Sequence, residues 1–551
     1  VDAQELARRA LVLEPYSEPA VRLLIRAAAL GGDPPGALAT YHTFVSRLEL
    51  ELHEAPSREL SALADRVRHD RWRVRTFLCA EAELPLVRRP AHRTALSVVA
   101  EALASGPRTL IVSGEPGSGR TRLAAECLDH FALEGAVLAT ARPLETDHDA
   151  PWSTLRAIMR AGLANAPGVA ATDPAALAVL ADLVPELASR APGRPPRDRG
   201  EVAAAIGALL RAVADETPVA VAIDDAHFAD GATIGALATA VGELDAAPVL
   251  FVVTTPDVAQ AGPPELLALR ASVGGRVPGR AVHLDPLSLE EVGELVRTGA
   301  PWCTGETGRD RLARRILFET AGNVFLTATL LRALRESALL REDAFNWPLP
   351  DKTLDSPLPI SVPPLARMAI TASVGRLDGE SQRLLVTASV LGLGIDPELA
   401  AGLSDLPPSR VEDLLTGLER LAFVVFDGER YAFAAPLVAQ VIRGEFLTPG
   451  QQRALQQRMV ARLAVRTDLE SRLLRTELQA GVEPGSEVLH QAVAIAREAI
   501  VSGARRTATR ALAAAERIGT SDAAGAAELE QLRATLSVAA SMPLAQAGRR
   551  A

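Results

Sequence analysis

The chain has 551 residues, 48% of them hydrophobic, and its 58 basic and 68 acidic side chains give a net charge of −10. This length predicts roughly three to five domains, each large enough for its own core. The acidic balance argues against a protein that coats nucleic acid, because binding many phosphates requires a basic face. The three scattered cysteines indicate neither a disulfide framework nor a metal site. No apolar run reaches the roughly 18 residues of a membrane span, so we expect a soluble, cytoplasmic protein with no membrane partner.

Residues 1–70 have the pattern of packed helical hairpins. Ser17 is predicted to cap a second apolar helix, and Gly31 and Gly32 are predicted to end it. Helices paired through Ala, Leu and Tyr are typical of tetratricopeptide packing. An ordinary helical bundle fits the same pattern, and both alternatives stay open here.

Residues 109–128 combine a short buried strand, a glycine-rich turn and a helix, which is the order that a phosphate-binding P-loop requires. The glycines let the backbone curl so that its N–H groups point inward, and the helix adds its positive end. Thr121 stands where a hydroxyl ligates Mg²⁺, whereas the lysine expected at position 120 is replaced by Arg120. The residues predicted to bind nucleotide are Gly114, Glu115, Pro116, Gly117, Ser118, Gly119, Arg120 and Thr121.

Two acids follow the apolar run at residues 219–223, where a buried strand of a parallel sheet would bring them to a ligand-binding edge. We assign Asp224, together with Thr121, to Mg²⁺, and Asp225 to catalysis as the group that polarises the attacking water. Solvated acids that merely close a strand are the alternative. His227 is a further candidate base, although a histidine in this place is more often packed.

Strand and helix patterns alternate across residues 105–255 and predict a three-layer α/β domain with a parallel sheet. We place a P-loop NTPase core at 85–264 and a small helical domain at 265–345. Within the latter, Ser288 and Glu291 form a predicted capping box, and Gly322 with Asn323 ends a helix. A proline-rich linker is expected at 346–364.

Residues 365–463 are predicted to form a winged-helix domain, because helices are followed by a hairpin at Asp427 and Gly428. The helix predicted at 409–421, capped by Ser409, is net negative and so is a poor DNA reader. We therefore expect an intramolecular regulatory role for this domain. Residues 466–551 form a further helical repeat segment that is expected to receive protein partners.

The first 70 residues closely resemble the end of the bacterial transcriptional activator domain of AfsR/SARP-type regulators. The resemblance is carried, in order, by Glu-Pro-Tyr-Ser-Glu at 14–18, Gly-Asp at 32–33, Ala-Leu-x-x-Tyr at 37–41 and Pro-Ser-x-Glu-Leu at 56–60. It implies a winged DNA-binding domain upstream of Val1. It also implies that promoter DNA is bound only through that upstream domain.

Residues 85–460 resemble the signal-transducing P-loop ATPases of the STAND class. The resemblance is carried by the P-loop, by Asp-Asp-Ala-His-Phe-Ala-Asp at 224–230 and by Glu-Thr-Ala-Gly-Asn at 319–323. Departures from the family pattern occur as well. Arg120 replaces the lysine of the P-loop, and Val324 replaces the proline of Gly-Asn-Pro. In the Val-Gly-Arg-Glu-like box that lies beside adenine in this family, called the adenine box below, Arg88 replaces the glycine and Pro90 the glutamate. In addition, Thr-Thr-Pro-Asp at 254–257 lacks the arginine that usually follows this strand, the sensor strand, in the family. Residues 433–436 lack the histidine that the winged helix of the family often directs to the phosphate.

These resemblances imply a signal-responsive transcriptional regulator in which an ATP/ADP switch, with Mg²⁺, controls assembly. Homo-oligomer formation is left open. Arg120 keeps the charge of lysine but is a bulky planar fork, so we expect weakened nucleotide binding and slow or absent ATP hydrolysis. The alternative is a pseudo-ATPase that serves as an interaction scaffold. A cyclase or kinase would need a catalytic domain that these residues do not contain.

Overall fold

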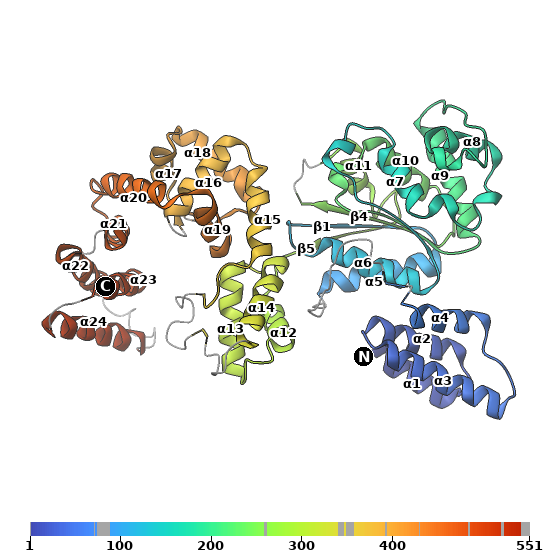
Figure 1. Cartoon of the computed structure of the whole chain (residues 1–551), viewed down its shortest axis with the longest axis horizontal. Helices are drawn as coiled ribbons and strands as arrows, with labels where there is room; N and C mark the ends of the chain where they lie inside the picture. The colour runs from blue at the N-terminus through green and yellow to red at the C-terminus, as the bar shows by residue number, and fades with distance from the viewer. Residues whose placement is uncertain are drawn as a thin grey trace. The chain divides into compact units, whose positions relative to one another are not determined.

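The computed structural model describes residues 2–70, 72–73, 89–257, 262–339, 347–348, 358–391, 394–428, 430–482, 485–519 and 523–541. The chain divides into two compact units (Figure 1). Residues 1–317 and 322–353 form the first unit, and residues 318–321 and 354–551 form the second.

The first unit begins with four helices, as the sequence predicted. They are α1 (Asp2–Leu13), α2 (Glu18–Leu30), α3 (Pro34–Glu51) and α4 (Arg58–Arg68). Ser17 does occupy the N-cap of α2, but its side chain makes no capping hydrogen bond. Asp33 and Ser57 cap the next two helices, each accepting a backbone N–H with its side-chain oxygen.

The next segment forms a parallel five-stranded sheet within the described residues, in the order β2-β3-β4-β1-β5. The strands are β1 (Arg108–Gly114), β2 (Val137–Ala141), β3 (Val219–Ile223), β4 (Val249–Pro256) and β5 (Gly279–Leu284). The prediction of a three-layer α/β domain is confirmed. The prediction that the core ends at residue 264 and that 265–345 is helical needs a correction, because β5 pairs with β1 and extends the sheet beyond residue 264. Its alternation of exposed and buried residues is weak, as expected for an edge strand.

Helices cover both faces of this sheet (Figure 1). Alternate residues of each strand enter opposite cores, so Val221 and Phe251 pack on one side while Ala222 and Val252 pack on the other. One face is covered by α5 (Pro90–Ser105) and α6 (Arg120–Leu133). The helices of the other side are α7 (Ser153–Ala161), α8 (Pro174–Leu183), α9 (Arg199–Ala214), α10 (Gly231–Gly242) and α11 (Pro264–Ser272).

Three more helices follow β5. They are α12 (Leu289–Gly299), α13 (Glu306–Thr320) and α14 (Val324–Leu339). The predicted capping box is present at the start of α12, where Ser288 and Glu291 exchange side-chain to backbone hydrogen bonds. Ala321 and Gly322 both have positive φ between α13 and α14, so the predicted break in the helix is confirmed.

The far end of α6 is buried against the first four helices. Ala132 and Leu133 of α6 share one apolar core with residues of α2, α3 and α4, among them Ile25 and Leu63. Around this core, Arg26 forms an ion pair with Glu134, and the Arg66 Nε donates to the Leu133 carbonyl at 2.9 Å. Cationic groups are favourable at this point, because a helix presents unpaired carbonyls and negative potential at its C-terminus.

The second unit contains six helices and a small three-stranded sheet before its C-terminal part, in the residues the structure describes. The helices are α15 (Pro364–Gly375), α16 (Gly379–Leu391), α17 (Pro397–Ser404), α18 (Pro408–Arg420), α19 (Pro436–Phe446) and α20 (Pro449–Leu463). The strands β6 (Gly394–Ile395), β7 (Val424–Phe426) and β8 (Tyr431–Phe433) pair in the order β6-β8-β7.

The antiparallel pairing of β7 with β8 confirms the hairpin predicted at Asp427 and Gly428. The predicted cap at Ser409 is wrong, because Pro407 holds the N-cap position of α18 and Ser409 lies inside its first turn. Proline at the first helical position favours this earlier start, since its missing N–H would have no helical partner there. A winged-helix assignment stays a prediction.

Four helices complete the described chain: α21 (Leu469–Val482), α22 (Ser486–Val501), α23 (Arg505–Ile518) and α24 (Ala523–Ser541). They pack around Leu473, Ile495 and Leu512. No helix among the described residues combines the length and the apolar character that crossing a membrane requires. The predicted linker at 346–364 lies mostly outside the described residues.

Candidate nucleotide site

The glycine-rich turn between β1 and α6 has the backbone of a phosphate-binding loop. Gly117 and Gly119 have φ values of +82° and +98°, in the left-handed region that favours glycine. A Cβ on Gly117 would come within 2.7 Å of the Asn323 side-chain oxygen. The first residue of α6 is Arg120, so the N-terminal end of that helix opens directly on the loop.

Three successive carbonyls of this loop are held from outside. The Asn323 side-chain amide donates to the Pro116 carbonyl at 2.8 Å, and the Phe325 N–H donates to the Gly117 carbonyl at 2.9 Å. Arg89, which is buried, donates to the Ser118 carbonyl at 3.1 Å. Because a peptide's N–H and carbonyl point in opposite directions, fixing the carbonyls outward leaves the N–H groups of Gly117 and Gly119 available on the inner side, while the Ser118 N–H donates to the Glu115 carbonyl at 3.1 Å.

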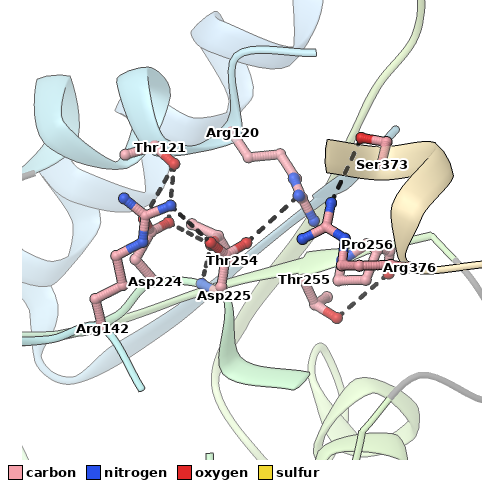
Figure 2. Close-up of polar contacts among 10 residues, drawn as sticks. All are labelled: Arg120, Thr121, Arg142, Asp224, Asp225, Thr254, Thr255, Pro256, Ser373 and Arg376. Atoms are coloured by element: carbon pink, nitrogen blue, oxygen red, sulfur yellow. Dashed lines mark hydrogen bonds and ion pairs between the residues drawn. The ribbon is translucent and has the colours of Figure 1, made fainter. Parts of the chain in front are cut away.

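Asp224 lies against the start of α6. The Thr121 hydroxyl is 3.0 and 3.1 Å from its two carboxylate oxygens, and the Thr254 hydroxyl donates to its Oδ1 at 2.6 Å (Figure 2). The sheet explains this meeting, because β3 pairs in register with β4 and both end at the same edge. The predicted partnership of Thr121 and Asp224 therefore exists in space.

Asp225 meets two arginines. Its carboxylate lies 3.5 Å from the Arg120 Nη2 and 3.1 Å from the Arg142 Nη2 (Figure 2). Arg142 also brings its Nε to 3.7 Å from Asp224. Asp225 has a left-handed backbone, with φ at +53°, and its N–H donates to the Thr254 hydroxyl at 2.8 Å. Two carboxylates thus face two guanidinium groups in the same small space.

Burial governs the electrostatics of this cluster. The pKa of Asp224 is raised by desolvation, while the hydrogen bond from Thr254 acts in the opposite direction. The pKa of the Arg120 guanidinium is lowered by burial and is raised again by the charge of Asp225. Only 2% of the Asp224 side chain and 11% of the Arg120 side chain are exposed, so these charges interact with little solvent screening.

The residues fit a nucleotide phosphate. The Ser118 hydroxyl and the Nη1 of Arg120 are both buried without a hydrogen-bond partner, and both belong to the loop or to the first helical residue. Buried polar groups are normally satisfied, so two unsatisfied donors beside a curled loop point to an anionic ligand with several acceptor oxygens.

The donor set also fits Mg²⁺, which prefers oxygen ligands and usually takes few from the protein. Thr121 and Asp224 supply such oxygens within one hydrogen-bond distance of each other. No group of three or more His, Cys, Asp or Glu side chains suited to a metal occurs in the described part of the chain. Phosphate oxygens and water would therefore have to complete the shell.

Sequence reasoning found the loop and the acids but missed four residues around them: Arg89, Arg142, Thr254 and Asn323. Two of these had a usable signal, because Arg142 directly follows β2 and Thr254 lies near the end of β4, the two strands that flank β3. His227 lies in a short helical turn with its ring 3.9 Å from that of Phe228, which favours the packing role. Residues 86–88 of the altered adenine box lie outside the described residues.

A parallel sheet, a curled glycine loop that opens a helix and an acid-threonine pair at the adjacent strand end define a P-loop ATPase domain, a fold that implies nucleotide binding. Comparison of the chain with known protein families agrees with this assignment. The AAA ATPase domain family matches residues 85–252, and the bacterial transcriptional activator domain family matches residues 2–68. The chain therefore carries an activator domain followed by an AAA ATPase domain, the order found in AfsR/SARP-type regulators. This pair of domains indicates a transcriptional regulator.

Solved structures with similar folds include a Walker-type ATPase of Pyrococcus abyssi, with 16% identity over 65% of this chain and 96% of that chain, and a TM-score of 0.40. A STAND protein with a tetratricopeptide repeat sensor from Pyrococcus horikoshii has 15% identity over 84% of this chain and 57% of that chain, with a TM-score of 0.29. A chain of Drosophila ORC bound to DNA has 13% identity over 65% and 95% of the two chains, with a TM-score of 0.29. No curated protein matches the chain.

Proposed function

We propose that this protein is a signal-responsive transcriptional regulator whose ATPase domain binds ATP or ADP and thereby controls the activator domain. The observation that carries the proposal is the position of α6. Its N-terminal end contributes Arg120 and Thr121 to the candidate nucleotide site, and its C-terminal end lies in the core of the activator helices. A helix of 14 residues is about 20 Å long and stiff, so it can transmit a small displacement from one end to the other.

Within this proposal the loop residues 114–121 bind the phosphates, and Thr121 with Asp224 would hold Mg²⁺. The ion, when bound, would neutralise part of the phosphate charge. Asp225 is the residue that would accept a hydrogen bond from the attacking water. Because Arg120 contacts Asp225, its carboxylate is less free to do so, and we expect slow or absent hydrolysis.

We further propose that the ATPase core extends from about residue 85 to Leu284, since β5 completes its sheet. The segment 287–345 would then be the small helical domain, 365–463 a winged-helix domain, and 466–551 a helical repeat that receives a protein partner or signal. Promoter DNA would be bound through a domain upstream of Val1.

The test is nucleotide binding measured by calorimetry and thermal shift on the wild type, Arg120→Lys and Thr121→Ala. We expect micromolar-range ATP or ADP binding, tighter binding in Arg120→Lys and loss of the Mg²⁺ dependence in Thr121→Ala. Hydrogen exchange of α2 and α4 with and without nucleotide would then report on the activator domain. Absence of nucleotide binding in all three proteins would refute the switch.

A second candidate function is a scaffold that has kept the fold and lost the switch. The specific observation in its favour is the pairing of Asp225 with two arginines, which occupies the group that would act on water. The same titrations separate the two functions, because a scaffold gives no nucleotide-dependent change in any of the three proteins.

A further inference from the structure

Arg142 lies beside the acids because of the strand register. In the parallel pairing of β2 with β3, Ala141 is opposite Ile223, so residue 142 is the neighbour of Asp224 across the edge of the sheet. The Asp224 N–H donates to the Ala141 carbonyl at 2.9 Å and fixes that register. Pro143 follows, and a residue before proline is restricted to extended backbone, which limits the directions Arg142 can take.

The contacts of Arg142 are those of a cation shared between two carboxylates. Its Nη2 is 3.1 Å from the Asp225 Oδ2, and its Nε is 3.7 Å from the Asp224 Oδ2. The same Oδ2 of Asp224 is 3.1 Å from the Thr121 hydroxyl. Arg142 therefore approaches the side of Asp224 at which Thr121 and a divalent ion would meet.

The net charge of the cluster around Arg142 determines how a divalent ion can bind there. Asp224 and Asp225 are balanced by Arg120 and Arg142, so the cluster is close to neutral as it stands. A divalent ion entering alone would add two uncompensated positive charges beside a buried carboxylate, which is unfavourable where solvent screens little. A nucleotide brings three or four negative charges, so ion and guanidinium can both be accommodated once phosphates are present.

Arg142 is also able to move. Its side chain is 47% exposed, whereas Asp224 is 2% exposed and held from two sides by threonine hydroxyls. The long flexible stem lets the guanidinium leave the acids at small cost, since an exposed ion pair contributes little. Planar guanidinium groups bind phosphate oxygens through paired hydrogen bonds, so a phosphate in the loop offers an alternative partner.

We propose that Arg142 is a positioning residue that couples the metal to the nucleotide: it excludes a free divalent ion from Asp224 and Asp225 until phosphates draw its guanidinium away. This inference rests on the nucleotide site of the proposed function. It also places an arginine directly after β2, whereas Asp257 directly follows β4.

The experiment measures two affinities on the full chain. Mn²⁺ alone is titrated by electron paramagnetic resonance, and ATP is titrated by calorimetry in the presence of a metal chelator. For Arg142→Ala we expect Mn²⁺ to bind about tenfold tighter, because a cation is removed from the metal site. We expect metal-free ATP to bind about tenfold more weakly, because the same cation no longer contacts the phosphates. Arg142→Lys should keep the wild-type Mn²⁺ affinity.

Arg160→Ala is the matched control, since Arg160 lies on the same unit and pairs with Glu186, not with Asp224 or Asp225. It should change neither affinity. An unchanged Mn²⁺ affinity in folded Arg142→Ala, or a fall of both affinities together, would overturn the inference. If the wild type binds no ATP with or without metal, the proposed function fails while the Mn²⁺ titration still decides the role of Arg142.

Discussion

The Thr254 hydroxyl donates a hydrogen bond of 2.6 Å to the Asp224 carboxylate, and both side chains are almost fully buried. The same hydroxyl accepts the N–H of Asp225 at 2.8 Å, so one oxygen orients both acids. Strand β4 therefore pairs with β3 and also fixes the direction in which Asp224 faces the P-loop helix.

Thr254→Val, which keeps the shape and removes the hydroxyl, is expected to destabilise the first unit by about 2 kcal/mol. The reason is that the buried Asp224 carboxylate and the partly buried Asp225 N–H both lose the Thr254 hydroxyl. Urea unfolding followed by circular dichroism measures this. Thr254→Ser keeps the hydroxyl and should cost about 1 kcal/mol or less; equal stability of the valine and serine variants would contradict the assignment.

Arg120→Lys is expected to tighten ATP binding by about tenfold, because a compact ammonium fits between phosphates where a planar fork is crowded. The substitution also removes the contact with Asp225. Calorimetry in the presence of Mg²⁺ gives the dissociation constants. Arg160→Lys, at a distant ion pair, serves as the control, and equal affinities of Arg120→Lys and the wild type would show that the arginine is not limiting.

The steady-state ATPase rate of the wild type is expected to be slow or absent. Asp225, the candidate catalytic residue, is engaged by Arg120, a contact that remains when phosphates draw Arg142 away. Phosphate release under saturating ATP measures the rate. A rate in the range usual for ATPases of this class, lost in Asp225→Asn, would mean that Arg120 does not restrain Asp225 when nucleotide is bound and that the slow-hydrolysis prediction is wrong.

Glu134→Ala is expected to cost about 1–3 kcal/mol and to loosen the activator helices from α6. Glu134 is 18% exposed and lies within 3.9 Å of Arg22 as well as in an ion pair with Arg26, which is 28% exposed, so its removal leaves partly buried cations without their acid. Faster hydrogen exchange in α2 and α4 would report the loosening. Glu5→Ala, which breaks a largely exposed pair with Arg8, should change nothing measurable.

Stability is expected to fall as the pH decreases from about 6.5 to 4. Burial, with Arg89 and Arg122 nearby, lowers the pKa of His92 to about 4, and burial with Arg26 nearby lowers that of His130 to about 4. The unfolded chain therefore binds more protons than the folded chain within this window, and stability rises with pH across it.

Urea unfolding at pH 7, 5.5 and 4.5 tests this pH dependence. His92→Leu should lose less stability than the wild type over that range, by on the order of 1–3 kcal/mol. His148→Leu, at an exposed position, controls for the replacement of a histidine by leucine. Parallel curves for the wild type and His92→Leu would show that His92 does not contribute.

Local patterns determined much of this protein. The spacing of Gly114, Gly117 and Gly119 before a helix, and the apolar run that ends in Asp224 and Asp225, are short-range features because loop curvature and strand burial depend on neighbouring residues. The resemblance of residues 1–70 to an activator domain was likewise readable from contiguous motifs, and comparison of families confirms it.

Tertiary structure decided which distant residues complete the site. Strand β5 was missed because an edge strand exposes half of its residues and has little apolar signal, and its pairing with β1 depends on residues 170 positions away. Arg142 and Thr254 reach the acids only because β2 and β4 flank β3, an order that the sequence does not state. The packing of the C-terminal end of α6 against the activator helices was likewise decided by tertiary structure. It joins segments about 70 residues apart in the sequence, which only folding brings together.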